Sequence, residues 1–167
     1  MTLAIIAGNG DLPKLIIKEC QKNNKNFIIL LIAGQSNPEE YKDLPYHILQ
    51  IGSISQALSI LQDNKASEVV FAGGVKKPSF TNIKVDKEGA ILLSKIIGNK
   101  IFGDDNILTT ITNFFAKKGF KIVGADQIIK NIISSKGILT NKKPSKSDLE
   151  NIDIACKALE TMSDIDI

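Results

Sequence analysis

The sequence predicts an α/β protein built on a doubly wound parallel sheet of about five strands, with a helix towards its C-terminal end. Short continuous apolar runs, typical of strands buried on both faces, alternate with segments whose apolar residues recur at helical spacing. The first run also leads through glycines directly into a helix start, as the first strand of such sheets often does. With right-handed crossovers, this alternation predicts the strand order 3-2-1-4-5.

The predicted strands are the most apolar short segments of the chain. The run at residues 27–32 is apolar throughout, which indicates burial on both faces of the sheet. A polar loop containing prolines separates this run from the third strand. The full set of predicted strands comprises residues 3–6, 27–32, 46–51, 67–72 and 120–123.

The predicted helices begin at residues that suit a helix N-terminus. Asp11, Ser53 and Asp86 are expected to cap the helices that follow them. Ser147 and Glu150 have the spacing of a capping box for the last helix. The predicted buried faces carry Ala90, Leu93, Ile96 and Ile97 in the helix at 86–97, and Leu108, Ile111, Phe114 and Phe115 in the next helix. Apolar residues also line the last helix, at Leu149, Ile152, Ala155, Cys156 and Leu159.

The charged residues argue against a nucleic-acid partner. The net charge is +3, and all 21 basic residues are lysines that are scattered along the 167-residue chain. Arginine makes most of the bidentate contacts to bases and phosphates, and this chain has none. The lysines are therefore expected to form a solvated surface.

Location is predicted from apolar runs and cysteines. No apolar run reaches the roughly 18 residues that span a bilayer. Cys20 and Cys156 lack the spacing of a metal or redox site, and both are expected to be buried apolar residues in a reducing compartment. A cytoplasmic protein is expected, with at most a peripheral contact with a membrane.

The turn after the first predicted strand is a candidate ligand site. Gly8 and Gly10 can bring backbone N–H groups and a helix N-terminus close to a phosphate, and Asn9 can extend its amide into a cleft. The dinucleotide fingerprint requires a third glycine where Pro13 stands and an acidic residue after the second strand, and residues 32–35 contain none. Nicotinamide dinucleotide binding is therefore not expected. A turn that binds no ligand is the open alternative.

A second glycine turn follows the fourth predicted strand. In the order 3-2-1-4-5 the first and fourth strands are neighbours, so both turns meet at the switch point where such sheets bind ligands. Lys76 can neutralise a phosphate there, whereas the alternative is a strand end followed by solvated lysines. The candidate substrate-binding residues are Gly8, Asn9, Gly10, Pro13, Gly73, Gly74 and Lys76.

Asp104 and Asp105 are the candidate metal ligands. One or two carboxylates can bind Mg²⁺ together with substrate phosphates. The alternative is an ordinary N-cap with a favourable helix-dipole charge, which we favour for one aspartate while the other stays open. His47, the only histidine, has no serine or cysteine partner in a catalytic arrangement, so no catalytic residue is assigned.

Four stretches, in this order and at this spacing, resemble a known family. They read IIAGNGDLP at residues 5–13, VVFAGGVKKP at 69–78, GDD at 103–105, and GILT with KPS within 137–145. No single stretch is specific, but the set is. The chain resembles the N-terminal part of the UDP-2,3-diacylglucosamine pyrophosphatases of Gram-negative lipid A biosynthesis, of the type that is not a metallophosphoesterase. The resemblance covers nearly the whole chain.

The resemblance implies a two-domain enzyme of which this chain holds the first part. Residues 1–145 would form a Rossmann-like substrate-binding domain, and residues 146–167 a helix and the start of a connection to a C-terminal catalytic domain. Family enzymes use Mg²⁺ and hydrolyse UDP-2,3-diacylglucosamine to 2,3-diacylglucosamine 1-phosphate and UMP. The matching glycines, Asn9 and Lys76 would face the sugar-phosphate. Catalysis is expected to need a separately encoded C-terminal domain.

Two other interpretations are open. The chain can be a ligand-binding or interaction domain without catalysis, including a gene remnant. The second is an unrelated Rossmann-type nucleotide enzyme, which tight binding of a nicotinamide dinucleotide would support.

An exposed apolar surface is expected around residues 149–167, and a homodimer would cover it.

Overall fold

The computed structural model describes residues 1–76, 83–98, 104–130, 132–134 and 137–164, without the side chains of 104–106 and 163–164. A short 3-10 helix, labelled η1, lies in the loop between the second and third strands. In chain order the elements are β1 (Thr2–Ala7), α1 (Leu12–Lys22), β2 (Phe27–Ile32), η1 (Pro38–Tyr41), β3 (Tyr46–Leu49), α2 (Ile54–Asp63), β4 (Ala66–Ala72), α3 (Lys87–Gly98), α4 (Asp104–Lys117), β5 (Lys121–Ile122), α5 (Ala125–Ile128) and α6 (Lys146–Asp164).

The sheet confirms the predicted topology. It has five parallel strands in the order β3-β2-β1-β4-β5. β1 lies at the centre, where Ile5 pairs with Ile29 of β2 and with Val70 of β4. The neighbouring strands β1 and β4 are therefore the switch point of the sheet, and their carboxyl ends meet at one edge.

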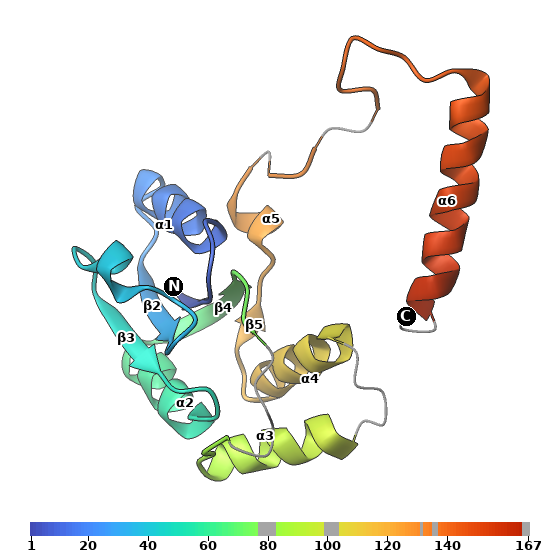
Figure 1. Cartoon of the computed structure of the whole chain (residues 1–167). Helices are drawn as coiled ribbons and strands as arrows, with labels where there is room; N and C mark the ends of the chain where they lie inside the picture. Colours follow the sequence, from blue (N-terminus) through green and yellow to red (C-terminus); the bar gives the residue numbers. More distant parts are fainter. Residues whose placement is uncertain (77–82, 99–103, 131, 135–136, 165–167) are drawn as a thin grey trace. The chain divides into compact units, whose positions relative to one another are not determined.

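Helices cover both faces of this sheet (Figure 1). Side chains alternate along a strand, so β1 supplies both cores. Leu3, Ile5 and Ala7 pack in the cluster on the side of α1 and α5. Ala4 and Ile6 pack in the other cluster, with residues of α2, α3 and α4. The chain is a doubly wound α/β fold, as the alternation of its segments predicts.

The buried face of α3 differs from the prediction. The helix buries Gly89, Leu92 and Ile96, whereas the predicted residues Ala90 and Ile97 are exposed. The cause is a close backbone approach, because a Cβ on Gly89 would overlap the carbonyl oxygen of Gly52. This contact turns Gly89 towards the core, together with Leu92 and Ile96, which lie on the same face of the helix.

In α4 the prediction is wrong for one residue of the apolar face. Phe114 and Phe115 are buried and Ile111 packs against them, as predicted. Leu108 is half-exposed and lies at the edge of a cavity.

Two of the predicted caps make no capping hydrogen bond. Asp11 stands at the N-cap position of α1, but its carboxylate pairs with Lys14 at 2.8 Å. Ser53 stands at the N-cap position of α2 and its side chain makes no cap bond either. Asp86 does cap α3, since its Oδ1 accepts a hydrogen bond from the N–H of Gly89 at 2.8 Å.

The capping box of the last helix lies two residues before the predicted one. The Ser145 N–H donates to Asp148 Oδ2 at 2.8 Å, and the Asp148 N–H donates to Ser145 Oγ at 3.2 Å. α6 consequently begins at Lys146, ahead of the predicted Ser147. Both pairs have the same spacing, so the pattern alone could not choose between them.

The chain divides into two compact units, Met1–Ile132 and Ile133–Ile167. The sheet and its helices belong to the first unit, in which Cys20 is buried as predicted. The described helix of the second unit is α6, which has no other described element in its unit to pack against. Cys156 is therefore exposed, contrary to the prediction. Leu149, Ile152 and Leu159 of α6 are exposed too, in agreement with the exposed apolar surface expected in this part of the chain. Among the described helices, none has the length and apolar character needed to cross a membrane.

Candidate functional site

The two glycine turns are bonded to each other at the carboxyl ends of β1 and β4. The Asn9 N–H donates to the Gly74 carbonyl oxygen, and the Gly74 N–H donates to the Asn9 carbonyl oxygen, both at 2.8 Å. A Cβ on Gly8 would overlap the Gly74 carbonyl oxygen, and a Cβ on Gly73 would lie 2.5 Å from the Asn9 carbonyl oxygen. Gly73 also has a positive φ of 87°. We call Gly8, Asn9, Gly73 and Gly74 the glycine clasp.

The clasp uses backbone groups that could otherwise bind a phosphate. The Gly8 N–H donates to the Ala72 carbonyl oxygen at 2.8 Å, in line with the sheet. The Gly10 N–H donates to the side chain of Asn9, also at 2.8 Å, so the Asn9 amide oxygen faces its own turn. Pro13 is buried in the first turn of α1. The structure thus gives these residues structural contacts, and their contact with a substrate stays a prediction.

A third turn joins the clasp, and sequence reasoning missed it. Ser36 Oγ donates to the carbonyl oxygens of Ala7 at 2.5 Å and Gly8 at 3.3 Å. Gln35 Oε1 accepts a hydrogen bond from the Lys76 N–H at 2.9 Å. Gln35 and Ser36 follow β2, the other neighbour of β1, so their polar side chains at that position were the available signal.

Two lysines near the carboxyl ends of β1 and β4 differ in whether their ammonium groups are free to bind an anion. Lys14 Nζ lies 2.8 Å from carboxylate oxygens of both Asp11 and Glu40. Hydrogen bonds to these two carboxylates raise the pKa of Lys14. Lys76 is exposed, and no described carboxylate lies within ion-pair distance of its ammonium group. Lys76 is therefore the better candidate for a phosphate contact.

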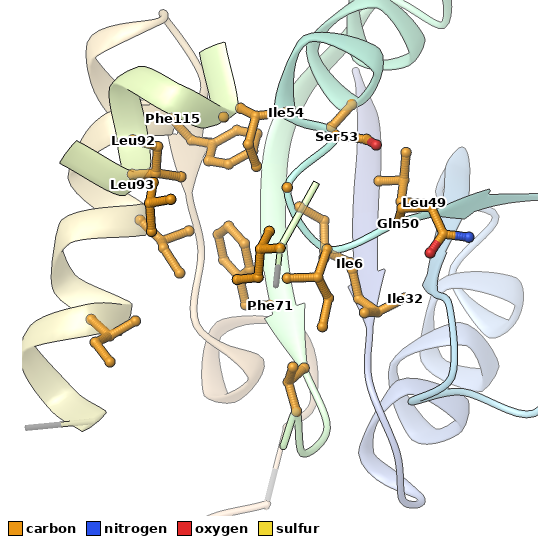
Figure 2. A pocket seen from close by; sticks show the side chains of 18 of the residues that line it. Ile6, Ile32, Leu49, Gln50, Ser53, Ile54, Phe71, Leu92, Leu93 and Phe115 are labelled. Carbon is orange, nitrogen blue, oxygen red and sulfur yellow. The ribbon is translucent and has the colours of Figure 1, made fainter. Parts of the chain in front are cut away.

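An apolar cavity of about 430 Å³ opens next to the clasp, on the side of α2, α3 and α4. Gly73 and Val75 line it, so it adjoins the turn after β4. Among the described residues that line it, none is charged. Figure 2 shows Ile6 and Phe71 from the sheet and Leu92 and Leu93 from α3 around this space, with the polar side chains of Gln50 and Ser53 at one side. The volume is within the range of ligand pockets, about 300–1,000 Å³.

Asp86 ties together two elements that border this cavity. Its Oδ2 accepts hydrogen bonds from the N–H groups of Ser55 at 2.7 Å and Gln56 at 3.4 Å, while Oδ1 caps α3 through Gly89. Burial alone would raise the pKa of Asp86, but these hydrogen bonds outweigh it and hold the pKa below the ordinary value of 3.8. One carboxylate therefore caps both α2 and α3. The sequence predicted only the cap of α3.

The described residues contain no ready-made metal site. Among them, no group of three or more His, Cys, Asp or Glu side chains could hold a metal ion. Asp104 and Asp105 form the first turn of α4, as predicted, and their side chains lie outside the described residues. His47 is an exposed residue of the edge strand β3.

Comparison with protein families gives one match over the first unit. Residues 2–132 match the family model described as the LpxI N-terminal domain. The chain belongs to this family. The LpxI N-terminal domain thus comprises the sheet, the glycine clasp, Lys76 and the cavity, and it ends at the boundary of the first compact unit.

Among known proteins, the chain is similar to the UDP-2,3-diacylglucosamine pyrophosphatase LpxI of Caulobacter vibrioides. The two are 28% identical over 167 residues, which cover 99% of this chain and 59% of the relative. The chain thus spans less than two thirds of the length of this LpxI relative.

Solved structures give only distant likenesses. UDP-glucose 4-epimerase of Thermus thermophilus, solved with NAD, is 13% identical with a TM-score of 0.42, and the match covers 89% of this chain and 43% of the epimerase. dTDP-glucose 4,6-dehydratase of Bacillus anthracis, also solved with NAD, is 11% identical with a TM-score of 0.44, and the match covers 99% of this chain and 52% of the dehydratase. At these scores the likeness says nothing of the cofactor or activity of an LpxI N-terminal domain.

Proposed function

We propose that this chain is the N-terminal, substrate-binding part of a UDP-2,3-diacylglucosamine pyrophosphatase of lipid A biosynthesis. The reaction would convert UDP-2,3-diacylglucosamine and water into 2,3-diacylglucosamine 1-phosphate and UMP. The family match over residues 2–132 carries the proposal, because it includes both turns of the glycine clasp and Lys76. The Caulobacter relative, whose match covers 99% of this chain, is a UDP-2,3-diacylglucosamine pyrophosphatase, which supports the same substrate.

In this proposal the chain binds and orients substrate. The exposed ammonium group of Lys76 neutralises a phosphate oxygen, and the clasp and a separate hydrogen bond from the Lys76 N–H to Gln35 hold the backbone around Lys76 in place. No residue of this chain is assigned to the hydrolytic step. That step requires a C-terminal domain, supplied as a separate polypeptide or within a longer protein.

Mg²⁺ enters the proposal through the family resemblance. Bound Mg²⁺ would neutralise charge on the pyrophosphate, and Asp104 and Asp105 are the proposed ligands. The described side chains form no magnesium site by themselves, so we derive no step through the metal. The proposed location is the cytoplasm, with at most a peripheral contact with the inner membrane. The proposed protein partners are a separately encoded C-terminal domain and, as a second candidate, another copy of this chain in a homodimer.

The experiment combines the chain with a separately produced C-terminal domain of the family, Mg²⁺ and UDP-2,3-diacylglucosamine. We expect UMP release from the mixture and calorimetrically measured substrate binding by the chain alone. Binding without UMP release would favour the ligand-binding domain without catalysis. The absence of both substrate binding and UMP release would contradict the proposal.

Lys76→Ala tests the proposed phosphate contact. The variant is expected to weaken substrate binding by about tenfold, because a charge-assisted hydrogen bond contributes roughly 1.5 kcal/mol or more. Lys42→Ala is the matched control, since Lys42 is exposed and has no ion pair among the described residues. Equal dissociation constants for the two variants would contradict the proposed contact between Lys76 and the phosphate.

A further inference from the structure

We propose that the apolar cavity beside the glycine clasp binds a fatty-acyl chain. This inference rests on the proposed function, in which the substrate carries acyl groups, and it assigns one of them to a specific place. The cavity is a continuation of the core on the α2, α3 and α4 side, and it opens at the edge of the sheet where the strands end.

The lining of the cavity has the chemistry of a lipid site. Most of its described lining is aliphatic and aromatic, including Ile6, Phe71 and Phe115, and no charged residue is among the described residues that line it. Each methylene group of an acyl chain that such a surface removes from water strengthens binding about fourfold. Most of the walls come from strands and helices, which hold side chains in place better than loops do, and the rest come from loop residues such as Gln50, Val75 and Ile83.

The same lining disfavours the uracil ring. A pyrimidine base carries several hydrogen-bonding groups, and each one buried without a partner costs free energy. Among the described residues, the polar side chains that line the cavity are those of Gln50 and Ser53, which lie at one side. The nucleotide end of the substrate therefore belongs outside this cavity, and an acyl end belongs inside.

The position of the cavity fits a molecule with a charged end and an apolar end. Gly73 and Val75 line the cavity, and Lys76 is the next residue along the chain. A ligand can thus place its phosphate at the exposed Lys76 and extend its chain past Val75 towards Phe71. The clasp fixes this arrangement because Gly74 is hydrogen-bonded to Asn9 on both backbone groups.

Tryptophan quenching by a brominated acyl chain tests the proposal in the full chain. The protein has no tryptophan, so one introduced residue is a clean reporter. Leu108→Trp puts the indole at the cavity, and Ile97→Trp is the matched control, because Ile97 does not line the cavity and is exposed to a similar extent, 50% against 49%. The probe is a dibrominated fatty acid, used below its critical micelle concentration.

We expect saturable quenching of Trp at position 108 and none beyond collisional quenching at position 97. Adding Ala57→Leu, which extends a side chain into the cavity, should weaken this quenching at least about tenfold, as expected when two methylene groups are excluded. Near-ultraviolet circular dichroism checks that the double variant is folded. If it is not, the comparison of positions 108 and 97 decides alone.

A parallel titration with UDP-2,3-diacylglucosamine carrying brominated acyl chains separates this inference from the proposed function. Calorimetric binding of this ligand without quenching at position 108 overturns the acyl site and leaves the proposed function standing. Saturable quenching by the brominated fatty acid without binding of the UDP-lipid overturns the proposed function and supports the acyl site. Equal quenching at both positions means surface adsorption and overturns the acyl site.

Discussion

At the scale of single residues, the glycine clasp separates two glycines that look equivalent in the sequence. Gly8→Ala would push a methyl group into the backbone of the second turn, whereas Gly74→Ala meets open space. We expect Gly8→Ala to lower the free energy of unfolding by about 1–3 kcal/mol, because the two turns must separate. Gly74→Ala should stay within about 0.5 kcal/mol of the parent. Urea denaturation measures both, and equal midpoints would refute this account of the clasp.

Glu68 is a second residue whose contacts make a prediction. Its two carboxylate oxygens pair with Lys25 Nζ at 2.7 Å and with Lys121 Nζ at 2.9 Å. The hydrogen bonds from Lys25 and Lys121 hold the pKa of Glu68 below its ordinary value of 4.5. A carboxyl with a depressed pKa in the folded state stabilises fully above its unfolded pKa, and the stabilisation is lost as pH falls through the folded value.

Glu68→Gln should therefore reduce the free energy of unfolding at pH 7 by roughly 1–2 kcal/mol. The difference between parent and variant should shrink as pH falls below 4.5, the ordinary pKa of this carboxyl. Urea denaturation at a series of pH values measures it. Glu39→Gln is the control, since Glu39 is exposed and no ion pair of its side chain is among those of the described residues. A constant difference from pH 7 to pH 3 would contradict the role assigned to Glu68.

At the scale of elements, Asp86 joins α2 to α3. Asp86→Ala removes two helix caps at once and should cost about 2 kcal/mol, while Asp86→Asn should retain part of this stability because its amide oxygen still accepts. Asp43→Ala, an exposed aspartate of a loop, is the matched control. Denaturant titrations compare the three variants. Destabilisation by Asp86→Ala no larger than that of the control would contradict the double cap.

The arrangement of helices and strands was also the part of the structure that the sequence predicted best, although it missed several contacts between them. The strand order followed from buried runs separated by helices, and with it the meeting of Gly8 with Gly74. The caps could not be predicted in full, because Asp86 bonds to Ser55 across a gap of thirty-one positions. The rotation of α3 depends on the contact between Gly89 and Gly52, which is equally remote in sequence. The cavity depends on how completely side chains fill the space between helices, and no local pattern encodes that.

At the scale of the whole molecule, the first unit should fold without the second. A fragment ending at Ile132 keeps the whole sheet and α5, so its thermal midpoint should lie within about 4 °C of the full chain. A fragment ending at Ser145 should behave alike, although the sequence predicts that point as the domain boundary. A fragment ending at Lys118 loses the buried residues Phe120 and Val123 and should lose cooperative unfolding. Calorimetry of the three fragments tests this, and an unfolded fragment ending at Ile132 would refute it.

The clasp has a consequence for the history of this domain. The space that a side chain would need at position 8 is occupied by the backbone of the turn after β4, and the space at position 73 by the backbone of the turn after β1. A change at either position becomes tolerable only when the opposite turn has moved. The two turns, far apart in the gene, should therefore be inherited as a pair, and substitutions in one should be accompanied by compensating substitutions in the other.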